Sequence, residues 1–243
     1  MTIRLRRLFL SLLLLWGMLS LIAIRSASAQ PPDEALGEAA IFLTLFPQLR
    51  NLPAPPVIQT GLRVSYQAAS AIIGGGAAGG GVVQYDVVAA DGRQTLIYAI
   101  NYIDNGVGQP IPTAPNALVG LPALGEFWIH PNVLVNAEAV ANSNLAVTRY
   151  NKTINGATIT VVRFQSQTSG GQAVWEFSTG SGLLVFYSRS TFLPSTGQTS
   201  ETQSNLIGFR TVTLPLVPQH NPSELGTDWR RAGIYGHPGD RGC

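Results

Sequence analysis

The second half of the chain repeats a short alternating segment followed by a turn dipeptide, and this pattern strongly limits the possible folds. Candidate turns occur at Asn155-Gly156, Ser169-Gly170 and Gly180-Ser181, between segments in which apolar and polar residues alternate. Alternation with period two is typical of a β-strand with one buried face. The turn dipeptides tolerate the positive φ that tight hairpins require. The pattern therefore predicts successive hairpins, that is, an antiparallel meander.

Pairing about the last two turns predicts one apolar and one polar face. In this register Trp175 lies opposite both Phe164 and Phe186, and Phe177 lies opposite both Val162 and Leu184. Arg163 lies opposite Glu176, where an ion pair suits a wetter surface. Turns and faces agree, which supports the meander. The predicted apolar face contains Val162, Phe164, Trp175, Phe177, Leu184 and Phe186.

The first half of the chain carries a similar signal around Asp91-Gly92, a dipeptide that favours a two-residue hairpin turn. Folding about this turn predicts three apolar pairs on one face. The pairs are Val87 with Leu96, Tyr85 with Tyr98, and Val83 with Ile100.

The glycine-rich stretch from Ile72 to Val83 contains Gly74, Gly76 and Gly79 in the spacing G-x-G-x-x-G, which occurs in phosphate-binding loops. Such a loop needs a helix after it, whereas the residues that follow alternate with period two. The stretch is therefore interpreted as a flexible connection between two strands that places Tyr66 roughly opposite Tyr85. Neither a nucleotide nor any other cofactor is predicted.

Other segments complete the predicted fold. A helix is expected over Asp33 to Phe46 and a proline-rich linker over Arg50 to Val57; a long loop runs from Asp104 to His130. Pro131 begins a short helix, and a further strand falls within Thr199 to Leu214. The predicted fold class is mainly β: one antiparallel meander sheet, curved like a half-barrel, with an N-terminal helix and one short central helix.

The N-terminus reads as an export signal. Three arginines at positions 4, 6 and 7 precede an apolar run from Leu8 to Ile24, and Ala27-Ser28-Ala29 fits a cleavage site. Both the general secretory and the twin-arginine route stay open, and an uncleaved membrane anchor is the alternative. The predicted divisions are an export signal (1–29), a helix and linker (30–57), an antiparallel β domain (58–216) and a loosely held tail (217–243).

Charge and cysteine content exclude several classes of function. Only 12% of residues are charged, and four of the 15 basic residues fall in the leader, so 11 remain against 13 acidic ones. Lys152 is the single lysine, so no basic surface for nucleic acid is predicted. Cys243 is the single cysteine, which excludes an intrachain disulfide. Whether Cys243 has a role stays open.

The hairpin from Val174 to Ser188, "VWEFSTGSGLLVFYS", resembles one found in the periplasmic lipoprotein-carrier superfamily of LolA-like and LppX-like proteins. The order of elements is also similar: a leader, a helix, a meander, a central helical insertion and more strands. The resemblance implies a curved sheet that holds acyl chains on its concave face. It supplies no ligand-binding residues.

Catalytic and metal-binding patterns are weak in this sequence. There is no G-x-S-x-G or S-x-x-K motif. The three histidines at 130, 220 and 237 are far apart, so neither a catalytic residue nor a metal site is predicted. Glu126 precedes Phe127 and Trp128, an arrangement that fits an aromatic plug over the sheet and, as the alternative, a sugar-binding loop.

The sequence thus favours an exported, non-enzymatic β domain that binds a lipid or other apolar ligand, or an envelope protein. The alternatives are a surface interaction or structural module, and a carbohydrate-active protein around Glu126. The oligomeric state stays open. The candidate ligand-binding residues are Trp175, Phe177, Leu184, Phe186, Phe127 and Trp128.

Overall fold

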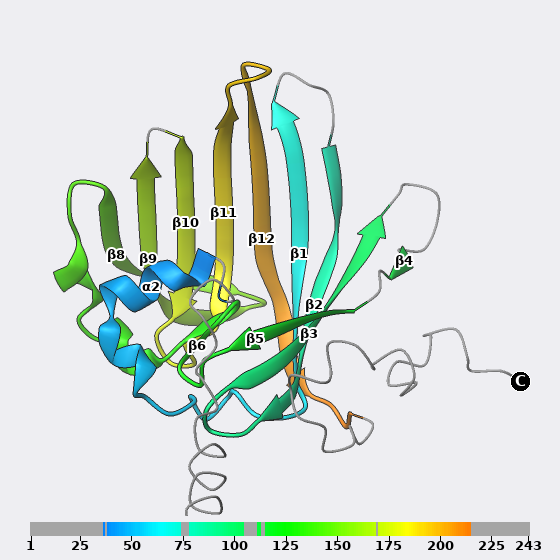
Figure 1. Ribbon diagram of the computed structural model, residues 1–243, viewed down its shortest axis with the longest axis vertical. Helices are drawn as coiled ribbons and strands as arrows, with labels where there is room; N and C mark the ends of the chain where they lie inside the picture. The colour runs from blue at the N-terminus through cyan, green and yellow to red at the C-terminus, as the bar shows by residue number, and fades with distance from the viewer. Residues whose placement is uncertain are drawn as a thin grey trace, which may run out of the picture.

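The computed structural model describes residues 36, 38–73, 78–104, 111–112, 115–168 and 170–214. Most of them form one strongly bent antiparallel sheet of ten strands (Figure 1). Its order is β4-β3-β2-β1-β12-β11-β10-β9-β8, with β5 paired to β3 beside this path. The path ends at β4 and β8, so the sheet is open. The predicted fold class is confirmed.

The sheet consists of two meanders that run outward from its centre. Strands of the first are β1 (Leu62–Ile73), β2 (Ala78–Ala90), β3 (Thr95–Asp104), β4 (Ile111–Pro112) and β5 (Asn116–Gly120). Strands of the second are β8 (Leu145–Ile154), β9 (Ala157–Thr168), β10 (Gly171–Ser178), β11 (Leu184–Leu193) and β12 (Gln198–Thr211). The last of these begins one residue before the segment Thr199 to Leu214, where a final strand was predicted, and otherwise lies inside it.

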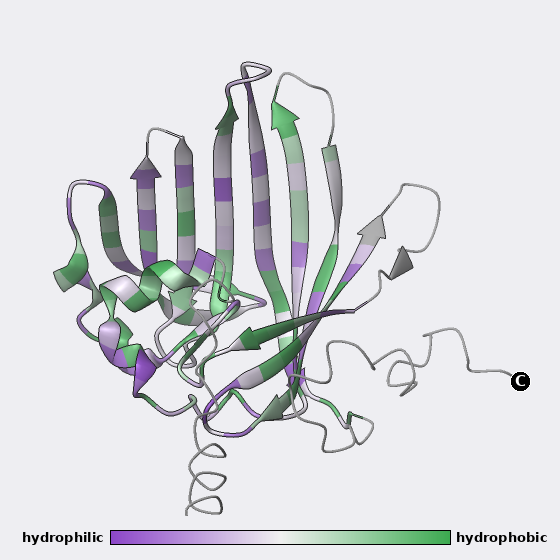
Figure 2. Cartoon of the chain, in the orientation of Figure 1, coloured by the Kyte–Doolittle hydropathy of each residue, from purple (hydrophilic) through white to green (hydrophobic). Residues whose placement is uncertain are grey.

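The two meanders meet where the first strand pairs with the last. Antiparallel register between β1 and β12 runs from Leu62 opposite Thr211 to Ile73 opposite Thr199. It is interrupted once, beside Tyr66, where Ile207 is an extra residue in β12. Colouring by hydropathy shows alternating bands along β9 and β12, as expected for strands with two different faces (Figure 2).

A short N-terminal helix packs on one face of the sheet. α2 (Ala40–Leu45) is followed by the 3₁₀ helix η2 (Pro47–Arg50). The ring of Phe42 meets Phe164 and Phe177 edge-on, with centroids 5.2 and 5.3 Å apart. The helix predicted from Asp33 to Phe46 is therefore present over its second half, and Asp33 lies outside the described residues.

The segment between the meanders crosses the same face. It contains β6 (Leu124–Gly125), β7 (Trp128–Ile129), α3 (Pro131–Leu134) and the 3₁₀ helix η3 (Ala137–Val140). The short helix predicted at Pro131 is confirmed. Backbone hydrogen bonds join this segment to the β10–β11 turn: Ile129 donates to Gly182 (2.9 Å), and Leu184 donates to Phe127 (2.9 Å).

The glycine-rich stretch joins two paired strands, as predicted. Ala71 lies opposite Ala78, which leaves a connection whose residues 74–77 are outside the described part of the chain. The register differs from the prediction by two residues, since Tyr66 lies opposite Val83. A two-residue shift keeps side chains on the same face, and the rings of Tyr66 and Tyr85 are 5.8 Å apart.

The turn at Asp91-Gly92 is longer than predicted. Ala90 pairs with Thr95, so four residues form the loop. The Asp91 carboxylate accepts hydrogen bonds from the backbone amides of Arg93 (2.8 Å) and Gln94 (2.9 Å). These side-chain bonds stabilise a wider loop than the dipeptide alone indicates.

This loop and a bulge at Val88 change the predicted β2–β3 pairs. Tyr85 lies opposite Ala99, one position away from the predicted partner, Tyr98. A one-residue slip moves side chains to the other face of a strand. Leu96 and Tyr98 therefore form a separate buried cluster with Val88, and the prediction of six residues on one face is wrong.

The predicted leader (1–29) and tail (217–243) lie outside the described residues. Within the described ranges, none of the helices has the length and apolar character needed to span a membrane.

Replacing Gly182 with alanine should destabilise the fold. Gly182 has φ +75°, and a Cβ there would lie 2.0 Å from the carbonyl oxygen of Ile129. Backbone strain and steric overlap act together, so we expect the free energy of unfolding to fall by about 2 kcal/mol or more in denaturant titrations. Gly180→Ala is the control, because nothing lies within 4 Å of its added Cβ. Equal effects of the two substitutions would contradict this prediction.

Candidate functional site

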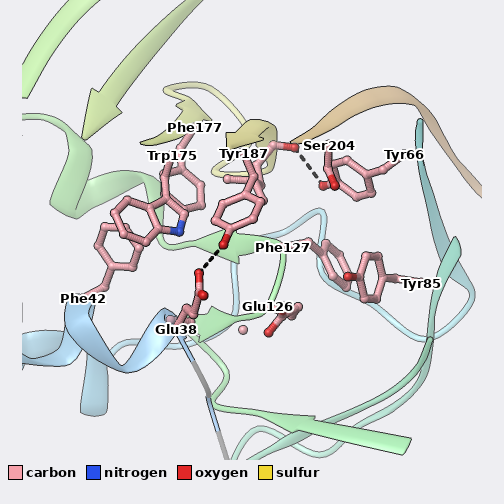
Figure 3. A pocket seen from close by; sticks show the side chains of 13 residues that line it. Glu38, Phe42, Tyr66, Tyr85, Glu126, Phe127, Trp175, Phe177, Tyr187 and Ser204 are labelled. Carbon is pink, nitrogen blue, oxygen red and sulfur yellow. Dashed lines mark hydrogen bonds between the residues drawn. The ribbon is translucent and has the colours of Figure 1, made fainter. Parts of the chain in front are cut away.

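A cavity of about 360 Å³ lies between the sheet, α2 and the turn that joins β6 to β7 (Figure 3). Its walls combine aromatic rings from both meanders with side chains of the covering segments. The residues that line it are Glu38, Ala39, Phe42, Tyr66, Tyr85, Gly125, Glu126, Phe127, Trp175, Phe177, Leu184, Tyr187 and Ser204.

Strand β10 supplies the wall beneath α2. Trp175 and Phe177 alternate with Glu176, so both rings face the helix. Phe42 of α2 packs edge-on against them, at centroid distances of 5.6 and 5.3 Å. Their partners across β9 are Phe164 and Val162, as predicted. The alternation of side chains along β10 therefore determines which residues form this wall of the cavity.

A bulge in β11 places two further residues at the cavity. Leu184 pairs with Phe177 as predicted, but Tyr187 rather than Phe186 pairs with Trp175. Val185 is the extra residue of the bulge. Because of it, Leu184 and Tyr187 both face the cavity, although three positions separate them.

Hydrogen bonds to the backbone of Leu184 accompany this bulge. Its amide donates to the carbonyl oxygen of Phe127, and its carbonyl oxygen accepts from the hydroxyl of Tyr66 at 2.8 Å. These partners come from the crossing segment and from β1. Thus three segments far apart in the sequence meet at one residue.

Glu38, in the 3₁₀ turn before α2, is held against the sheet. The Tyr187 hydroxyl donates to its Oε2 at 2.5 Å, and Arg189 Nη1 forms an ion pair with its Oε1. Both carboxylate oxygens are therefore engaged. This interaction fixes the start of the N-terminal helix to β11.

Glu126 lies in the two-residue turn between β6 and β7 and is the second carboxylate of the cavity. It is exposed to solvent, whereas its neighbours Gly125 and Phe127 are buried. Desolvation by the surrounding protein raises the pKa of Glu126 above its ordinary value. Its side chain forms neither a hydrogen bond nor an ion pair with any residue in the described part of the chain.

Three tyrosines of the cavity are neutral at physiological pH. Burial raises the pKa of Tyr187 to about 12, and the Glu126 charge adds to this effect. Burial and the same charge raise the pKa of Tyr85 further. Burial, followed by the charges of Tyr85 and Glu126, raises the pKa of Tyr66 well above its ordinary value. The Glu126 carboxylate thus lies close enough to influence all three phenols.

Of the six predicted ligand-binding residues, the structure places four around this cavity: Trp175, Phe177, Leu184 and Phe127. Trp128 is fully buried beside it, and its Nε1 donates to the carbonyl oxygen of Pro122 at 3.0 Å. Trp128 is therefore part of the aromatic plug over the sheet. Sequence reasoning missed Glu38 and Tyr187, and ligand binding by the four residues stays a prediction.

Phe186 lies on the opposite face of the sheet, so its prediction as a partner of Trp175 at the same site is wrong. The bulge at Val185 places it opposite Glu176. There, Lys152 Nζ lies 4.7 Å from the centroid of the Phe186 ring and 2.6 Å from Glu176 Oε2. Arg163 Nη1 is 3.7 Å from Glu176 Oε1, so the predicted ion pair is present, but Glu176 is buried and does not lie on the wetter surface that was predicted.

His130 has a structural position. Its Nδ1 accepts a hydrogen bond from the amide of Asn132 at the start of α3 (3.2 Å), and burial lowers its pKa. Across the described ranges, His, Cys, Asp and Glu side chains form no group of three or more that could hold a metal ion.

The fold and cavity define an open antiparallel sheet with a covered, aromatic-lined pocket. The chain matches no family model and no curated protein. Among solved structures it is similar to a DUF1329 family protein from Desulfovibrio piger, with 12% identity, a TM-score of 0.27 and coverage of 71% of this chain and 92% of that one. It is also similar to a protein described as an outer membrane lipoprotein-sorting domain from Vibrio parahaemolyticus, with 10% identity, a TM-score of 0.22 and coverage of 70% and 92%.

Removing the Tyr66 hydroxyl should destabilise the fold. In Tyr66→Phe the buried carbonyl of Leu184 loses its side-chain donor. We expect the free energy of unfolding to fall by about 1–2 kcal/mol in urea titrations, the cost of an unmet hydrogen bond. Tyr85→Phe is the control on the same wall, since the Tyr85 hydroxyl forms no hydrogen bond with the described residues. An unchanged midpoint for Tyr66→Phe would contradict the proposed role of the hydroxyl.

Glu126→Gln should stabilise the protein at neutral pH. Because the folded-state pKa of Glu126 is raised, the native state binds more protons than the unfolded state between the two pKa values, and stability falls as pH rises through this window. The substitution removes this penalty. Its effect should be present at pH 7 and vanish below the unfolded-state pKa of about 4, as measured by urea titrations at both pH values.

Glu138→Gln is the matched control, and its expected effect on the stability at pH 7 is opposite to that of Glu126→Gln. The hydrogen bond from Arg149, at 2.9 Å, is the main reason why the pKa of Glu138 is lowered. Its contribution to stability is present above the unfolded-state pKa and is lost as pH falls through the folded-state pKa. Glu138→Gln should therefore reduce stability at pH 7 and have little effect in acid. The same sign for both variants at pH 7 would contradict this assignment.

Proposed function

We propose that this chain is an exported, non-enzymatic binding protein that holds a small apolar molecule between its sheet and α2. The observation that carries the proposal is the 360 Å³ cavity lined by seven aromatic residues. Small-molecule sites occupy about 300–1,000 Å³ and are mostly apolar with a few polar groups.

The polar groups of the cavity suit binding better than catalysis. Glu38 has both oxygens engaged by Tyr187 and Arg189, and the Tyr66 hydroxyl is bonded to the backbone. Among the lining residues that the structure describes, Ser204 is the one aliphatic hydroxyl, and neither His nor Cys accompanies it. A nucleophile with an adjacent base is the usual arrangement for covalent catalysis.

Export is part of the proposal and rests on the sequence. The arginine-containing start, the apolar run and Ala27-Ser28-Ala29 fit a secretory signal. A periplasmic or extracellular location would give the cavity access to lipids and other envelope molecules. The hairpin resemblance to LolA-like carriers agrees with an apolar ligand.

Docking to an envelope protein is a second candidate function. The exposed large hydrophobic side chains of the sheet include Ile73 and Phe192 at one end, and Ile207 and Phe209 along β12. Large exposed apolar side chains are typical of interaction surfaces when they are contiguous. This function needs no occupied cavity, so ligand measurements distinguish it from the first.

The binding test uses N-phenyl-1-naphthylamine, a neutral apolar dye whose fluorescence rises in apolar surroundings. The delipidated protein should bind the dye, and Ser204→Phe should weaken binding by about tenfold or more, because the new ring occupies cavity volume. Ser200→Phe is the control. Ser200 lies on the same strand and the same face, outside the cavity lining, and is similarly half-buried.

Mass spectrometry of protein purified under native conditions gives an independent readout: we expect a co-purified small molecule that is absent from Ser204→Phe. A protein that binds no dye and carries no molecule would overturn the proposal and favour the docking function. Equal dye binding by both serine variants would place the ligand elsewhere.

A further inference from the structure

The charged side chains that line the cavity in the described part of the chain are all negative. Two carboxylates, Glu38 and Glu126, line it, and none of its described lining residues is Lys, Arg or His. The remaining polar side chains are three tyrosines and Ser204, which are neutral. A ligand group that enters this space therefore meets negative charge and aromatic rings.

The two carboxylates differ in how their charge is balanced. Arg189 neutralises Glu38, and the Tyr187 hydroxyl donates to the other oxygen of the same group. Glu126 has no such partner among the described residues, and protein surrounds it closely enough to disfavour its charge. Although Glu126 is exposed to solvent, this partial desolvation means that an opposite charge beside it would stabilise its carboxylate. The cavity thus contains one carboxylate that lacks a cation.

Aromatic rings lie near this carboxylate. Figure 3 shows Glu126 with Glu38 on one side and Phe127 and Tyr85 on the other, and with Tyr187 above it, and all of these residues line the cavity. The rings of Tyr85 and Phe127 are tilted by 30°, with centroids 5.1 Å apart. Trp175 and Tyr187 form a second neighbouring pair, 6.1 Å apart.

The faces of such rings carry negative electrostatic potential and attract cations, and cages of several aromatic residues recognise quaternary ammonium groups. We infer that the ligand of this cavity carries an ammonium group, which pairs with Glu126 beside the rings of Tyr85, Phe127 and Tyr187, on an apolar body that packs against Trp175 and Phe177. This inference rests on the proposed function, because it names the ligand class of the same cavity.

Other ligand classes fit the cavity less well. A carboxylate or phosphate end would be repelled by Glu126 and would find no cation on the described walls, since Arg189 is engaged by Glu38. A neutral alcohol would bind through its apolar part but would leave Glu126 unpaired. The order of affinity for one chain length is therefore ammonium, then alcohol, then carboxylate.

Three probes with an eight-carbon chain test this order: octyltrimethylammonium, octanol and octanoate. Each displaces bound N-phenyl-1-naphthylamine from the delipidated protein, and isothermal titration calorimetry confirms the affinities. We expect octyltrimethylammonium to bind about tenfold more tightly than octanol, because its cation interacts with both the Glu126 carboxylate and the aromatic rings. Octanoate should be the weakest.

Glu126→Gln isolates the charge. The substitution should weaken octyltrimethylammonium binding by about tenfold and change octanol binding by less than about twofold, since it keeps the size of the side chain. Glu138→Gln removes one negative charge outside the cavity, where Glu138 pairs with Arg149, and should leave both affinities unchanged. This control separates the cavity charge from the net charge of the protein.

The outcomes separate the inference from the proposed function. If octanol binds as tightly as octyltrimethylammonium, or if Glu126→Gln weakens both equally, the ammonium inference is overturned while the apolar binding function stands. If octanoate binds best, the ligand is anionic and the inference fails. If the dye and all three probes fail to bind, both the inference and the proposed function fail.

Discussion

The pairing of β1 with β12 is the interaction on which the rest of the structure depends. It joins two meanders that would otherwise be separate sheets. Twelve residues of β1 pair with twelve residues of β12, and these strands are the first and the last of the sheet along the chain. Tyr66 comes to the cavity from β1, and Leu184 and Tyr187 come from β11, on the other side of β12. The aromatic walls therefore exist only when this long-range pairing has formed, and closing so long a chain segment is entropically costly.

The local sequence pattern was sufficient to predict much of the strand pairing in the second meander. The turn at 169–170 correctly predicted that Trp175 pairs with Phe164 and that Glu176 pairs with Arg163. The next turn correctly predicted that Leu184 pairs with Phe177. In each case a short turn fixes the register, and alternation then assigns the faces. The open, bent sheet follows from these hairpins, because antiparallel neighbours twist as they are added.

Sequence reasoning failed where bonds from distant segments determine the backbone. The bulge at Val185 coincides with a hydrogen bond that Leu184 donates to Phe127 and one that it accepts from Tyr66, and neither partner is local in sequence. A two-residue turn rule therefore assigned Phe186 to the wrong face. The loop at 91–94 failed for a more local reason: the Asp91 side chain bonds to two amides and widens the turn. Glu38 was missed because a residue before a helix carries no signal that a tyrosine and an arginine of β11 will bind it.

The same distant bonds explain why the cavity stays open. Apolar walls normally collapse on a void because each lost contact costs dispersion energy. Here the ion pair and hydrogen bond at Glu38 fix α2 to β11, while the bonds at Leu184 fix the crossing segment and β1 to the same strand. Two polar attachments thus hold the cover at a set distance from the sheet, and Glu126 stands in the space between them. An open cavity with a carboxylate that lacks a cation reduces the stability of the protein, and the ligand that we propose would recover this stability on binding.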